Sequence, residues 1–112
     1  MLNISDDNRI TLTKGDTLPL KVSIKTVDGQ TYTPVEGDQL RFAISIGYKG
    51  TPLYQLILSM PIDLATLELV IPAEETAKLK YMTYNYDVEL THADGTVDTF
   101  ISSELTITGE VE

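Results

Sequence analysis

The sequence predicts an all-β fold, namely an antiparallel immunoglobulin-like β-sandwich of about seven strands with one short helical turn. Apolar and polar residues alternate along several segments, which is the period of a strand with one buried face. Turn sequences containing glycine separate these segments at short intervals and leave little room for the crossover helices of a parallel sheet. The 112 residues, 12.4 kDa, suffice for one hydrophobic core, so we expect a single domain over residues 1–112.

The first half of the chain carries four strand patterns, at residues 9–13, 18–24, 40–46 and 53–60. The pattern at 9–13 is short and ends at the turn Lys14-Gly15-Asp16. Two patterns have an apolar residue at every second position: Leu18, Leu20, Val22 and Ile24, then Leu40, Phe42, Ile44 and Ile46. The fourth is an apolar run that follows a loop with Gly and Pro.

Three further strands are expected at 67–71, 84–90 and 96–107. Asp94-Gly95 separates the last two, and two-residue Asp-Gly loops favour tight hairpins. These two strands are therefore predicted to be antiparallel neighbours. Residues 1–8 and 109–112 lack a strand pattern, and we expect them to be frayed ends, with an N-terminal arm as the alternative for 1–8.

The segment 72–79 breaks the strand period and has helical features. It starts with proline, places Glu74 and Glu75 early, and has Lys78 near its end, which suits one or two helical turns. In a sandwich such a turn crosses from one sheet to the other. Tyr84 follows it, at the position of the tyrosine corner of immunoglobulin-like domains.

Charge and composition exclude several classes of protein. The formal net charge is −9, which repels nucleic-acid phosphates and anionic lipids, so we expect neither nucleic-acid nor membrane binding. The absence of cysteine excludes a disulfide scaffold and thiolate metal sites. Charged residues interrupt Met1–Ile10, and no apolar run is long enough to span a membrane, so neither a signal peptide nor a membrane segment is expected.

Residues suited to catalysis are few. His92 is the single histidine, and a triad would need Asp94 or Asp98 to orient it and Ser102 or Ser103 as nucleophile. We instead expect a solvent-exposed turn histidine and no enzyme activity, cofactor or small-molecule substrate.

Acidic residues are plentiful but not arranged as a recognisable site. The pairs Asp6 and Asp7, Glu74 and Glu75, and Glu110 and Glu112 are expected to be mostly surface charge, because a small sandwich seldom encloses the cleft of a glycosidase. A calcium site from Asp6, Asp7 and Asp63 is the alternative, although no spacing matches an EF-hand loop. No metal is expected.

Six tyrosines are present against two phenylalanines, and tyrosine suits positions that are half in contact with water. The alternation places Tyr84 and Tyr86 in the core. Tyr48 and Tyr54 flank a Gly-Pro loop and are the predicted contact residues for a protein or a glycan. The strand edge near residues 9–13 is the second predicted contact.

The order of several motifs resembles small immunoglobulin-like tail and baseplate proteins of phages and prophages of Gram-positive bacteria, such as the N-terminal domain of baseplate upper proteins. The resemblance spans nearly the whole chain and rests on Thr13–Leu20, Val35–Phe42, Ile71–Leu79, Tyr84–Leu90 and Asp94–Thr99. Residues 80–83 depart from it, since such proteins often have a glycine before the tyrosine strand.

This resemblance implies a non-enzymatic structural module of a virion, associated with the tail or the baseplate and assembled in the bacterial cytoplasm. Its expected partners are other tail or baseplate proteins, and a second copy of the chain. The alternative is a carbohydrate-binding or host-surface adhesion module, which exposed tyrosines on a sandwich would also suit. A chaperone or secretion accessory is the least favoured interpretation.

Overall fold

The computed structural model describes residues 2–4, 8–25, 28–47 and 50–109. In chain order the elements are β1 (Leu2–Ile4), β2 (Ile10–Thr13), β3 (Leu18–Lys21), β4 (Gln39–Ile46), β5 (Gln55–Pro61), β6 (Glu68–Ile71), α1 (Ala73–Thr76), β7 (Thr83–Thr91) and β8 (Val97–Thr108). The predicted fold class, an all-β sandwich with one short helical turn, is confirmed.

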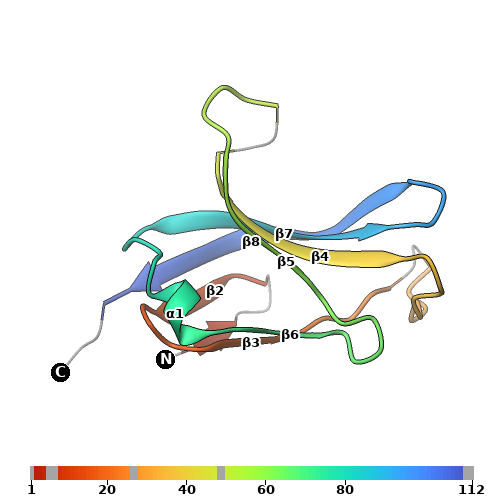
Figure 1. Cartoon of the computed structure of the whole chain (residues 1–112), viewed down its shortest axis with the longest axis horizontal. Coiled ribbons are helices and arrows are strands. Elements are labelled where there is room, and N and C mark those ends of the chain that lie inside the picture. The colour runs from red at the N-terminus through yellow and green to blue at the C-terminus, as the bar shows by residue number, and fades with distance from the viewer. Residues whose placement is uncertain (1, 5–7, 26–27, 48–49, 110–112) are drawn as a thin grey trace.

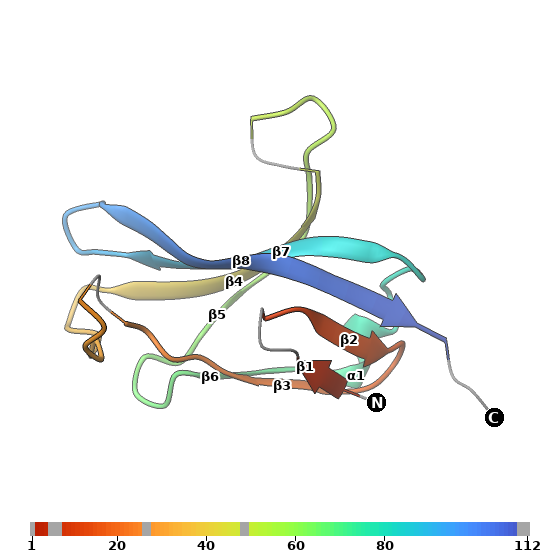
Figure 2. The same cartoon turned by 180° about the vertical axis from the view of Figure 1, so that it is seen from behind.

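Two sheets of unequal size form the sandwich. The larger sheet has the order β1-β2-β8-β7-β4-β5, and the smaller one pairs β3 with β6. The smaller sheet lies along one face of the larger, with α1 at one end (Figures 1 and 2). Because two strands face six, part of the inner face of the larger sheet extends beyond them.

The core lies between the two sheets and is built from the predicted alternating residues. Phe42 and Ile44 of β4 are fully buried, and the Phe42 and Tyr86 rings pack with centroids 5.4 Å apart. Tyr84 and Tyr86 are buried, as predicted. The buried apolar side chains are Ile10, Leu12, Leu18, Val22, Ile24, Leu40, Phe42, Ile44, Ile62, Leu69, Ile71, Leu79, Tyr84, Tyr86, Val88, Leu90, Leu105 and Ile107.

The segment between β6 and β7 changes sheet, as the sequence predicts. α1 follows the small sheet, and β7 belongs to the large one. Buried Thr76 anchors this crossing, because its hydroxyl donates to the carbonyl of Asp16 at 2.7 Å. The Tyr84 hydroxyl accepts the backbone N–H of Lys80 at 2.8 Å, which is the contact of a tyrosine corner.

Three expectations about the strands are wrong. Leu2–Ile4 pairs with β2 as β1, so this part of residues 1–8 is not frayed and adds an eighth strand to the seven predicted. β2 and β8 run parallel, with Ile10 beside Leu105, so the sheet is not wholly antiparallel. Regular pairing of β3 ends at Lys21, although Val22 and Ile24 remain buried as the alternation predicts.

The antiparallel pairing predicted across Asp94-Gly95 is confirmed, but the loop is longer than the expected two-residue Asp-Gly turn, since β7 ends at Thr91 and β8 begins at Val97. β7 and β8 pair antiparallel from Thr83 beside Thr106 to Thr91 beside Val97. At the loop, the N–H of His92 donates to the carbonyl of Thr96 at 2.8 Å. This hairpin brings His92 to the end of the sandwich opposite α1.

Candidate functional site

The predicted contact loop lies between β4 and β5. Tyr48 and Lys49 fall outside the described residues. Tyr54 is half-buried, and its backbone N–H donates to the carbonyl of Thr51 at 3.1 Å in a tight turn. Leu53 beside it is 81% exposed. Residues 50–54 project from the body of the sandwich at the top of Figure 1, so they are open to a partner.

The second predicted contact, a strand edge near residues 9–13, is wrong. β2 lies between β1 and β8 and is paired on both sides, so its backbone groups are used inside the sheet. The sequence did not reveal this, because β1 is only three residues long and β8 comes at the far end of the chain.

The edge strand β5 offers the longest unpaired backbone of the large sheet. β5 pairs with β4, and no described strand lies on its other side. Its seven residues, Gln55–Pro61, carry no charge, and Leu56 is 50% exposed. Ile57, Leu58 and Met60 are half-buried. An exposed, apolar, uncharged edge is a template for pairing with another chain.

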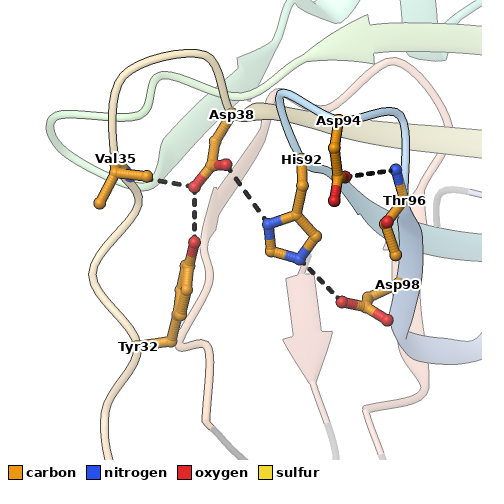
Figure 3. Close-up of polar contacts among 7 residues, drawn as sticks. All are labelled: Tyr32, Val35, Asp38, His92, Asp94, Thr96 and Asp98. Atoms are coloured by element: carbon orange, nitrogen blue, oxygen red, sulfur yellow. Dashed lines mark hydrogen bonds and ion pairs between the residues drawn. The ribbon is translucent and has the colours of Figure 1, made fainter.

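A cluster of polar residues lies at the sandwich end formed by the β7–β8 hairpin and the segment before β4 (Figure 3). His92 stands between two carboxylates, with Nε2 2.9 Å from Oδ2 of Asp98 and Nδ1 3.4 Å from Oδ1 of Asp38. Asp38 in turn accepts the hydroxyl of Tyr32 at 2.6 Å and the N–H of Val35 at 2.9 Å, both on Oδ2.

The prediction that His92 is a solvent-exposed residue of the turn is therefore wrong, because carboxylates and an aromatic ring surround its side chain. The His92 side chain is 29% exposed and that of Asp38 only 1%, and the Tyr32 ring meets the imidazole edge-on with centroids 6.0 Å apart. Asp38 lies 54 positions before His92, and no local pattern in the sequence joins the two.

The contacts within this cluster shift the pKa values of its residues. The pKa of His92 is raised, first by its hydrogen bond to Asp98 and then by the charge of Asp38, while burial opposes the shift. The pKa of Asp38 is lowered, mainly by the Tyr32 hydroxyl and the Val35 N–H. The same contact with Asp38 raises the pKa of Tyr32. The Asp94 carboxylate accepts the N–H of Thr96, and this hydrogen bond lowers the pKa of Asp94.

The structure does not bring His92 together with Ser102 or Ser103, as a catalytic triad would require. Both ring nitrogens of His92 face carboxylates, whereas Ser102 and Ser103 lie opposite Asp87 and Tyr86, farther along β8 than Asp98. The arrangement joins the hairpin to the segment before β4.

A pocket of about 330 Å³ lies next to this cluster. Its walls include Ile24, Leu90 and Phe100, and Tyr32, His92 and Asp98 also line it. It lies between the chain that follows β3, which contributes Ile24, and the part of β7 and β8 near the hairpin loop, which contributes Leu90 and Phe100.

Of the three aspartates of the alternative calcium site, the structure describes Asp63, and its contacts do not support the site. Asp6 and Asp7 fall outside the described residues. Asp63 accepts the N–H groups of Ala65 and Thr66 at 2.7 and 3.3 Å, so its carboxylate stabilises a local turn. Over the described ranges, no three His, Asp or Glu side chains gather in a way that could hold a metal ion.

No model of a known protein family matches the sequence, and no curated protein matches it. Within the described part of the chain, no helix has the length and apolar character needed to cross a membrane.

Proposed function

We propose that the chain is a non-enzymatic structural module of a phage or prophage virion, associated with the tail or the baseplate, that acts by docking to other virion proteins. The resemblance of its motifs to such proteins supports the virion assignment. The observation that supports docking is β5, an uncharged apolar strand on the open edge of the large sheet.

The open edge of β5 suits docking because backbone N–H and C=O groups can pair with an added strand, while side chains on both faces make contacts. Leu56 and Leu53 add exposed apolar surface on and beside that edge. Proteins usually protect an edge strand with charges or proline. Here the single proline is Pro61, at the last position of the strand.

Mass spectrometry of purified tailed particles tests the virion assignment. We expect the chain to be present in intact particles, in a fixed ratio to the major tail proteins. Its absence from particles, although it is made in the same infected or induced cells, would contradict this function. The genes on either side of its own supply the tail proteins for pull-down experiments.

A carbohydrate-binding or adhesion module is the second candidate, and the pocket beside His92 favours it. Tyr32 offers an aromatic side chain with a polar end, and Asp98 offers a carboxylate for sugar hydroxyls. A host cell-wall pull-down and a glycan array test this candidate, with Asp98→Ala for the pocket and Tyr54→Ala for the loop. Binding that both variants retain, or no binding at all, would remove it.

A further inference from the structure

We propose that the partner of β5 is β5 of a second copy of the chain, so that two large sheets join edge to edge. This inference rests on the proposed docking function and names one partner for it. The two strands would run antiparallel about a two-fold axis near Leu58, as an isologous contact requires. One continuous sheet would then cross both subunits.

The open strand edges of the described chain differ in how well they could pair. β1 is only three residues long. In the small sheet, β3 contains Pro19 and Lys21, and β6 contains Glu68, which are common protections of an edge. β5 has seven residues and no charge, and the uncharged stretch extends from Gly50 to Ile62. β5 is therefore the edge best suited to accept another strand.

Charge directs any contact between two copies to this edge. Each chain has a net charge of −9, so two copies repel each other over most of their surfaces. An isologous contact through residues 50–62 brings together the longest uncharged stretches of both molecules. The repulsion is then lowest at the contact, and it is screened further by salt.

Apolar area favours the same contact. Leu56 is 50% exposed, and Ile57, Leu58 and Met60 are only partly covered by their own chain. With the axis near Leu58, Leu56 of one copy lies beside Met60 of the partner subunit, so apolar residues meet apolar residues. A single pair of strands buries less area than a standard stable interface, so the dimer is expected to be weak.

Sedimentation equilibrium of the full chain tests the dimer. We expect the mass to rise from 12.4 kDa towards twice that value between about 1 µM and about 1 mM protein. Leu56→Lys should stay monomeric over this range. The matched control is Val70→Lys, which changes the net charge equally at a position 56% exposed on β6, and it should dimerise like the unmodified chain.

Cross-linking tests the position of the contact. The chain has no cysteine, so Ser59→Cys introduces a unique thiol on β5. Two such residues diagonal to each other across the axis would lie about 7–8 Å apart, within reach of a short bismaleimide. Ser102→Cys, at an exposed position of β8, is the control, because seven strand spacings of about 4.8 Å would then separate the two thiols.

The outcomes separate this inference from the proposed function. A chain that stays monomeric to about 1 mM, equal loss of dimer in Leu56→Lys and Val70→Lys, or cross-linking through residue 102 would overturn the β5 dimer. Each of these results leaves the virion role to be decided by the composition of particles. Particles that lack the chain would overturn the virion role even if the dimer forms.

Discussion

His92 and Asp98 connect the two sides of the β7–β8 hairpin next to its loop, with Nε2 of the ring 2.9 Å from Oδ2 of the carboxylate. The other ring nitrogen faces Asp38, from the segment before β4. A protonated imidazole therefore links two parts of the chain that form one end of the sandwich.

The first prediction is that His92 stabilises the protein more below neutral pH than above it. Its folded pKa is raised above the ordinary value of 6.5, so its contribution is fully present below 6.5 and is lost as the pH rises through the folded pKa. Urea unfolding between pH 5.5 and 9 should show the unmodified chain losing its advantage over His92→Gln towards the alkaline end. A constant difference across this range would contradict the prediction.

The second prediction concerns the titration of the imidazole itself. Because His92 is the single histidine, its NMR signals can be assigned without ambiguity. Asp98→Asn removes the largest cause of the raised pKa, so the pKa of His92 should fall towards its ordinary value. Glu75→Gln on α1 removes the same charge at a position that does not contact the imidazole, and it should leave the pKa of His92 high.

The third prediction concerns Gly37, which allows the segment before β4 to approach the hairpin. Its φ is +94°, and a Cβ there would lie 2.7 Å from the Cβ of Ala93. Gly37→Ala should therefore destabilise the protein and move Asp38 away from the imidazole, which lowers the pKa of His92.

Gly29→Ala is the control for this change. Gly29 has a similar φ of +84° but open space around a Cβ, so it should show the backbone cost alone, about 1–2 kcal/mol. Gly37→Ala should lower the free energy of unfolding by more than Gly29→Ala does, because the new methyl group would overlap the methyl group of Ala93. Equal losses in denaturant unfolding, with an unchanged histidine titration, would show that this close approach has no effect.

The fourth prediction concerns the tyrosine corner. Tyr84→Phe removes the hydroxyl that accepts the N–H of Lys80, and it should cost about 1–3 kcal/mol in the free energy of unfolding. The matched control is Tyr81→Phe, because the Tyr81 side chain is 66% exposed and its ring contact with Lys14 is retained. Losses of the same size in both variants would mean that the Lys80 contact contributes little.

Local patterns in the sequence predict much of this fold. Alternation placed Leu40, Phe42 and Ile44 in the core, because a strand with one buried face requires that period. Asp94-Gly95 indicated the hairpin, although its loop spans residues 92–96 rather than those two residues alone. The tyrosine corner was predicted because Tyr84 begins the strand pattern that follows the helical turn.

Features that depend on distant residues were missed. The parallel pairing of β2 with β8 joins Ile10 to Leu105, and no turn sequence connects the two strands. The contact of His92 with Asp38 likewise arises only when the hairpin and the segment before β4 meet at one end of the sandwich. The open edge of β5 depends on the order of strands in the sheet, which alternation does not determine.

The parallel pairing of β2 with β8 has a consequence for synthesis on the ribosome. β8 follows the other strands in the chain, yet it lies between β2 and β7 and hydrogen-bonds to both. Until it emerges, β2 and β7 lack their shared neighbour, and a nascent chain exposes apolar strand edges to its surroundings. Cooperative folding is therefore expected only after residues 97–108 have left the exit tunnel, with the slow rates typical of non-local β pairing.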